Sequence, residues 1–286
     1  MEGMGARPCG VGRIQLKLLG PAEAALDGRP IVFRTKKALA LLVYLAVDPG
    51  QHPRERLADL LWPDADVVDA RASLRTALNY MRQALGSCAD AVIAATRESL
   101  GVRAGAPVDL DVHALSHAQQ LARCSQCDIQ GHEIGAAVDR IHGPFLAGML
   151  LPDAPDFEGW IESQRTYWSG IESELLDRLA SRQMGERDAA AAISTLERWT
   201  SLNPDEESAW RRLIDAHLRT EDLAGARRVW SAYRHALAAL DAEPSDQMAD
   251  LHNQILGLCG AELERWLNAA KRDPATVRLE LSSRTA

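Results

Sequence analysis

The 286-residue sequence contains no apolar run long enough to cross a bilayer. Its longest strongly apolar run is ALALLVYLAV at 38–47, which is far shorter than a membrane span. The opening segment, residues 1–15, also lacks the continuous apolar stretch of a signal peptide. We therefore expect a soluble, cytoplasmic protein that does not act on a membrane.

Cysteine is scarce. The chain has five cysteines, and an odd number without an export signal favours reduced thiols over a disulfide framework. Only Cys124 and Cys127 form a CxxC pair. A structural zinc site usually needs a second clustered pair of ligands, but the histidines that follow, His132 and His142, are too far apart for finger spacing. We expect an irregular loop here and no metal site.

The motifs that carry common catalytic chemistry are missing as well. The sequence has no GxxxxGK(S/T) phosphate loop, no GxSxG nucleophile turn and no HExxH pair, and its eight histidines are dispersed. The glycine cluster at 9–13 precedes an expected strand and does not open a helix. We infer that the chain is not an enzyme and uses no cofactor.

Charge is distributed unevenly along the chain. Residues 1–110 contain 14 Lys/Arg and 12 Asp/Glu, whereas residues 111–286 contain 18 and 28, and together these give the net charge of -8. A slightly cationic first part joined to an acidic second part suggests a different partner for each.

The first part has the pattern of a winged helix-turn-helix preceded by an extra sheet. Short apolar runs flank Asp27-Gly28 within 13–34, which predicts a hairpin because the tight turn needs positive φ. Helical periodicity follows, with a first helix capped by Thr35 and a second over 53–62. A third helix leads to a second hairpin at about 91–104. We place the winged helix at 13–107, after a flexible segment at 1–12.

The third helix has one apolar stripe and one cationic face. On a helical wheel, the stripe contains Leu74, Ala77, Leu78, Met81 and Leu85, and the opposite sector contains Arg71, Arg75, Thr76, Asn79, Arg82 and Gln83. Arginine and amide side chains suit base edges in a major groove, and arginine also neutralises phosphate. A merely solvated face is the alternative. Two features of the context favour double-stranded DNA: the preceding helix, and the wing arginines Arg97 and Arg103.

From residue 108 onward we expect an all-helical region to 256, beginning with an amphipathic helix over 108–124. A long helix follows over 155–184, with an expected core stripe of Trp160, Ile161, Tyr167, Trp168, Ile171, Leu175 and Leu179. A sequence echo, that is, a repeat with a period of 34 residues, follows. The apolar residues Leu176, Leu179, Ala180, Ala192 and Leu196 recur 34 positions later as Trp210, Leu213, Ile214, Ala226 and Trp230. This period is typical of tetratricopeptide-like helix pairs, which bind proteins or peptides. Residues 257–286 form a C-terminal extension.

Several stretches, taken in order, resemble a known family. They are LKLLGPAEAALDGRPIVFRTKKALALLVYLA, RERLADLLWPDADVVDARASLRTALNYMRQALG, VDLDV, GPFLAGMLLPDAPDFEGWIESQR and ALDAEPSDQMADLHNQI. The sequence is similar to the bacterial transcriptional activators typified by the Streptomyces antibiotic regulatory proteins. These join a response-regulator-type winged helix to an all-helical bacterial transcriptional activation domain. The resemblance covers about 14–255, and it implies a mainly helical fold with small sheets.

The resemblance also implies functional residues. It places the DNA-reading helix at 70–85 and the wing at 91–104, and by position it implies Arg71, Arg75, Asn79, Arg82 and Arg97 as DNA contacts. We expect Arg54 and Arg103 to contact DNA as well. It implies a loop at 62–69 that contacts the sigma or alpha subunit of RNA polymerase, with Trp62, Asp64, Asp66 and Asp69 as its residues. It further implies a homodimer on direct repeats. The wing departs from the family pattern, because Ser99-Leu100-Gly101-Val102 replaces the usual Gly-Gly-Tyr.

Two functions are compatible with these features. The first is a sequence-specific DNA-binding transcriptional activator. The alternative is a tetratricopeptide-like interaction scaffold whose winged helix no longer binds DNA. The two differ in one observable, because DNA binding through arginines falls steeply with salt.

Overall fold

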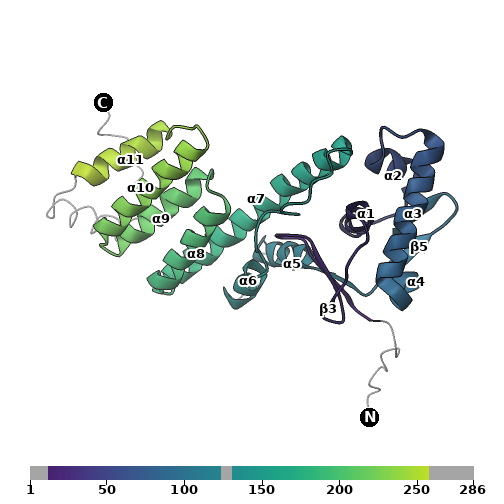
Figure 1. Cartoon of the computed structure of the whole chain (residues 1–286). Helices are drawn as coiled ribbons and strands as arrows, with labels where there is room; N and C mark the ends of the chain where they lie inside the picture. The colour runs from purple at the N-terminus through teal and green to yellow at the C-terminus, as the bar shows by residue number, and fades with distance from the viewer. Residues whose placement is uncertain (1–11, 124–130, 258–286) are drawn as a thin grey trace, which may run out of the picture. The chain divides into compact units, whose positions relative to one another are not determined.

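The computed structural model describes residues 12–123 and 131–257 (Figure 1). Its contacts divide the chain into two compact units. The first unit contains the described residues 12–123 and 136–171, and the second contains 131–135 and 172–257. The first unit therefore includes the expected winged helix and also the first part of the helical region. The expected class, mainly helical with small sheets, is confirmed.

A four-stranded sheet opens the first unit. Its strand order is β3 (Arg29–Pro30), β2 (Glu23–Leu26), β1 (Ile14–Lys17) and β7 (Val108–Leu110). The predicted Asp27-Gly28 turn joins β2 to β3, and both residues have positive φ, 50° and 78°. The hairpin expected from these two residues is therefore confirmed.

The strand β7 corrects the prediction of a helix from residue 108. Val108–Leu110 pairs in parallel with β1, and α5 (Asp111–Arg123) begins only after it. The buried Asp111 carboxylate stabilises the change from strand to helix, because it accepts hydrogen bonds from the backbone N–H groups of Leu18 (2.7 Å) and Leu19 (2.9 Å). Burial raises the pKa of Asp111, although these N–H donors favour its charged form.

Three helices and a second sheet complete the winged helix. The helices are α1 (Lys36–Val47), α2 (Arg54–Leu61) and α3 (Val67–Leu85), and the sheet has the order β4 (His52–Pro53), β6 (Ser99–Val102) and β5 (Ile93–Ala95). The short helices η1 (Gly86–Cys88) and α4 (Ala89–Val92) connect α3 to β5. Thr35 caps α1 as predicted, since its hydroxyl accepts the N–H of Ala38 at 3.2 Å.

The start of the long helix α7 (Pro155–Gly185) packs on α1 inside the first unit. The ring of Tyr44 lies 5.0 Å from that of Trp160, which also contacts Phe145 and Phe157 at 5.9 and 5.3 Å. Most of the expected α7 stripe is buried, but Tyr167 is 56% exposed. Trp168 beside it is buried, and Tyr167, about 100° away around the helix, lies at the solvent edge of the stripe.

Helix pairs make up the second unit. Residues 172–185 of α7 precede α8 (Ala189–Leu202), α9 (Glu207–Arg219), α10 (Leu223–Ala239) and α11 (Asp246–Gly257). All ten positions of the predicted 34-residue echo are buried. The helix α6 (Gly131–Val138) was not predicted, and the CxxC pair lies outside the described residues.

The described part of the chain contains neither a membrane-spanning helix nor a metal cluster. Within 12–123 and 131–257, no helix is both long enough and apolar enough to span a bilayer. In the same residues, no group of three or more His, Cys, Asp or Glu side chains is arranged to hold a metal ion.

Candidate nucleic-acid interface

Helix α3 divides into a buried stripe and an exposed polar face, as its sequence predicts. The five stripe residues Leu74, Ala77, Leu78, Met81 and Leu85 are at most 5% exposed and pack toward α1 and α2. Arg71, Arg75, Thr76, Asn79, Arg82 and Gln83 are all exposed. Figure 1 shows α3 as the long helix beside α2 and β5 in the first unit. Its polar face is therefore open to solvent within this unit.

The helix begins three residues earlier than expected. The Asp66 carboxylate caps it by accepting the N–H groups of Val68 and Asp69, both at 2.9 Å. Because this cap satisfies otherwise unpaired donors, the first turn forms at once after residue 66. The expected loop at 62–69 is thus shortened to 62–66, and Asp69 lies in the first turn of α3.

Arg54, Arg75 and Arg82 form a cluster of like charge, which we call the arginine cluster. Arg54 begins α2, and its Nε donates to the carbonyl oxygen of Thr96 at the wing tip at 3.0 Å. Burial lowers the pKa of the Arg54 guanidinium, and the nearby charges of Arg82 and Arg75 lower it further. In the described part of the chain, neither Arg75 nor Arg82 has a carboxylate within ion-pair distance.

The other predicted DNA contacts have different surroundings. Arg71 is ion-paired with Glu55 on α2. Arg103 is exposed after β6, and its Nε donates to the carbonyl oxygen of Asp90 at 2.7 Å. Arg97 is exposed at the tip of the wing. The structure therefore brings Arg54, Arg75 and Arg82 together, while Arg71 is partly neutralised.

A glycine in the second wing strand allows close packing against the turn before β4. Gly101 in β6 is buried, and a Cβ there would overlap the carbonyl oxygen of Gly50. The second wing strand can therefore approach the turn before β4 only if it carries glycine at this position. In the sequence, Gly101 is visible only as part of a departure from the family pattern, and nothing there predicts this contact.

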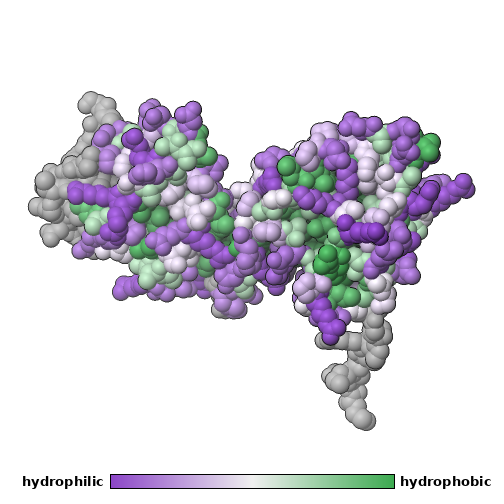
Figure 2. All heavy atoms as spheres, in the orientation of Figure 1, coloured by the Kyte–Doolittle hydropathy of each residue, from purple (hydrophilic) through white to green (hydrophobic). Residues whose placement is uncertain are grey.

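The segment between α2 and α3 presents apolar side chains that were not predicted from the sequence. Val67 and Val68 are 62% and 75% exposed in the first turn of α3. Asp64 is exposed and Trp62 is half-buried, whereas the Asp66 carboxylate is occupied by the cap. They are among six large apolar side chains that are at least half exposed in the described part of the chain. The face of the molecule shown in Figure 2 is largely hydrophilic, with separate apolar areas.

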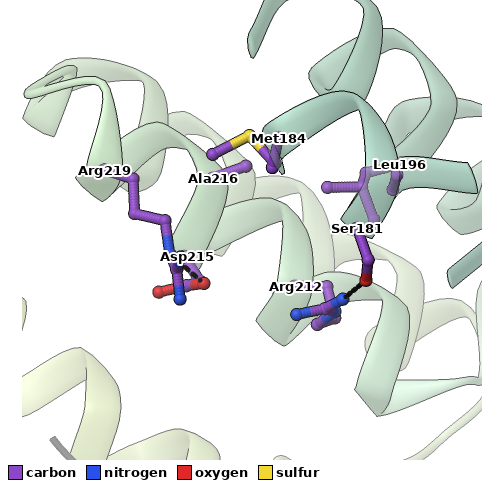
Figure 3. A pocket seen from close by; sticks show the side chains of 8 residues that line it. Ser181, Met184, Leu196, Arg212, Asp215, Ala216 and Arg219 are labelled. Carbon is purple, nitrogen blue, oxygen red and sulfur yellow. Dashed lines mark hydrogen bonds and ion pairs between the residues drawn. The ribbon is translucent and has the colours of Figure 1, made fainter. Parts of the chain in front are cut away.

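The second unit has a pocket lined by residues of α7, α8 and α9 (Figure 3). Met184 and Leu196 contribute apolar surface to it. The two arginines of its lining already have carboxylate partners, because Arg212 pairs with Asp177 at 2.6 Å and Arg219 with Asp215 at 2.8 Å. The pocket is thus of mixed character and is not an open anion site.

Comparison with known proteins identifies the class of this molecule. The sequence profile described as "Bacterial transcriptional activator domain" matches residues 108–256, just over half of the chain. The chain belongs to this family, and the resemblance drawn from its sequence is confirmed.

Two curated relatives and one solved structure are similar to most of the chain. The transcriptional regulatory protein EmbR of Mycobacterium tuberculosis is 26% identical over 257 residues, which cover 85% of this chain and 63% of EmbR. MoaR1, also a transcriptional regulatory protein of Mycobacterium tuberculosis, is 23% identical over 256 residues, covering 86% of this chain and 80% of MoaR1. The chain thus spans less than two thirds of the length of EmbR.

The solved structure is that of Mycobacterium tuberculosis EmbR in complex with a low affinity phosphopeptide. It superposes with a TM-score of 0.60 at 22% identity, covering 93% of this chain and 71% of that one. This likeness establishes the shared fold. Since the relatives are named as transcriptional regulators, the expectation that the chain is not an enzyme is also confirmed.

Proposed function

We propose that this chain is a sequence-specific DNA-binding transcriptional activator. The observation that carries the proposal is the exposed face of α3, where arginines without carboxylate partners stand beside amide side chains. Like charges in this cluster repel one another in the free protein, and a polyanionic partner would neutralise them. The names of EmbR and MoaR1 support the same function.

In this proposal α3 lies in a major groove. Asn79 and one or more of its arginines contact base edges, and the remaining cations contact phosphate. Arg54 joins the α3 face to the wing through Thr96, so the arginine cluster and Arg97 can follow one stretch of DNA backbone. The wing meets the adjacent backbone or minor groove through Arg97 and Arg103.

In the same proposal, the segment between α2 and α3 contacts RNA polymerase. Val67 and Val68 offer apolar contact area, and Asp64 and Asp69 offer exposed charge beside it. Trp62 is half-buried and anchors the start of the segment. The sigma or alpha subunit is the proposed partner, and two protomers bind direct repeats. A regulator of this kind works on the chromosome, in the cytoplasm.

Recovery of bound DNA followed by a salt titration tests the function. Fragments of the host genome that the full chain retains are sequenced, and the dissociation constant for a recovered site is measured over a range of salt. Each phosphate neutralised adds about 0.9 to the slope of log affinity against log salt, so the α3 and wing cations predict a slope of about 3 to 5 per protomer. A DNA affinity that does not change with salt concentration contradicts the proposal.

The pocket in the second unit favours the alternative, a protein-interaction scaffold. It lies between helices of the predicted tetratricopeptide-like repeat, and its lining combines apolar and charged side chains. The recovery of bound DNA separates the two functions, because a scaffold that does not bind DNA retains no specific fragments. In that case the second unit would be expected to bind a protein or peptide partner.

A further inference from the structure

Lys37, on α1, is the most heavily partnered lysine in the first unit's described residues. Its side chain is only 14% exposed. The Nζ atom donates to the carbonyl oxygen of Leu61 at the end of α2, lies 5.0 Å from the ring centroid of Trp62, and pairs with Asp153 at 2.8 Å. One ammonium group thus contacts a helix end, an aromatic ring and a carboxylate from three different segments.

Each of these contacts has a clear physical basis. The last turn of α2 contains no basic residue, so Lys37 supplies the positive charge that the C-terminal end of a helix favours. The indole of Trp62 attracts a cation to its face. The hydrogen bond from Lys37 lowers the pKa of Asp153, which keeps that carboxylate charged. Burial of an ammonium is costly unless it is paired in this way.

The partners of Lys37 connect the α2–α3 segment to the segment before α7. Trp62 is the first residue of the 62–66 loop, whose other end is fixed by the Asp66 cap. Asp153 lies in a tight turn in which the N–H of Ala154 donates to the carbonyl of Leu151 at 2.9 Å. The N–H of Leu151 in turn donates to the Glu158 carboxylate on α7, so this segment is attached to that helix.

We propose that Lys37 is a positioning residue for the polymerase-contact surface. It fixes the 62–66 loop through Trp62 and ties it to the segment that leads into α7. The family domain begins at residue 108, so this contact joins the loop that precedes Val67 and Val68 to the activator domain. Lys37 itself does not face DNA. Loss of its charge therefore separates DNA binding from activation. The expected effect on activation rests on the proposed function.

The test compares Lys37→Met with Asp153→Asn and with a matched control, Lys36→Met. Lys36 is the exposed neighbour on α1, so its replacement makes the same change in charge without touching the loop. Asp153 is 65% exposed, so Asp153→Asn remains informative even if Lys37→Met fails to fold. Three quantities are measured on the full chain: affinity for a recovered DNA site, activated transcription with RNA polymerase holoenzyme, and hydrogen exchange of the loop amides.

We expect both test variants to bind DNA within about twofold of the parent and to activate about tenfold less, which is a typical size for coupling between two sites. The backbone amides of Trp62, Asp64, Ala65 and Asp66 should exchange faster in both, and Lys36→Met should match the parent throughout. DNA affinity that falls in parallel with activation overturns the proposal, as do loop amides that exchange at the parental rate. If the parent neither binds DNA nor activates, the proposed function fails, and the exchange measurement still decides whether Lys37 positions the loop.

Discussion

Replacement of Arg75 by alanine should weaken DNA binding while leaving the fold intact. Arg75 is exposed on α3, has no carboxylate partner among the described residues, and lowers the pKa of Arg54 through like charge. Its removal takes away no packing and relieves repulsion within the arginine cluster. The melting temperature should therefore be unchanged or slightly higher, which is the opposite of what removal of a structural residue does.

The drop in affinity distinguishes two roles for the same side chain. If Arg75 reads a base, its truncation costs about 1 to 3 kcal/mol of binding free energy and relaxes specificity at one position of the site. If Arg75 neutralises a phosphate, its truncation weakens binding to all sequences equally and lowers the salt slope by about 0.9. Titration by fluorescence anisotropy at several salt concentrations, on the cognate site and on single-base variants, measures both quantities.

Arg29→Ala is the matched control. Arg29 is an exposed arginine on β3, outside the α3 face, and its replacement makes the same change in net charge. Parental affinity in Arg75→Ala at matched salt would refute the assignment of Arg75 to DNA. Equal drops in affinity for Arg75→Ala and Arg29→Ala would show that only overall charge matters.

Three further predictions concern the stability of the two units. Asp66→Ala removes the cap of α3 and should cost about 1 kcal/mol in urea denaturation, whereas exposed Asp64→Ala should cost nothing measurable. Asp111→Ala leaves two buried backbone N–H groups without acceptors and should cost about 3 kcal/mol; unchanged stability would show that β1 and α5 do not depend on this carboxylate. Burial lowers the pKa of His252, which stacks on Trp230 at 4.2 Å, so stability should fall as the pH drops below about 6.5; His252→Phe should flatten this dependence of melting temperature on pH, and a parental pH profile in that variant would contradict the assignment.

Local signals allowed much of the winged helix to be predicted. The Asp27-Gly28 turn and the Thr35 cap depend on residues close together in sequence, and the structure confirms both. The two faces of α3 follow from helical periodicity alone, and each side chain lies on the expected face. The start of α3 was misplaced because several aspartates precede it, and periodicity does not reveal which one caps the helix.

Contacts between distant segments could not be predicted in the same way. The parallel pairing of β7 with β1 and the acceptance of two N–H groups by Asp111 join residues more than ninety positions apart. The partners of Lys37 come from α2 and from the segment before α7, and nothing near Lys37 in the sequence indicates them. The arginine cluster was predicted in composition, but the position of Arg54 beside Arg75 and Arg82 depends on how α2 packs on α3.

Methylation interference on a recovered DNA site tests the central claim most directly, because methylation of guanine N7 blocks the major groove and leaves the minor groove open. If α3 reads that groove, methylation of guanines within each half-site should abolish binding of the full chain, and Arg75→Ala should be insensitive at the guanine that Arg75 contacts. Binding that tolerates N7 methylation throughout the site would contradict the account.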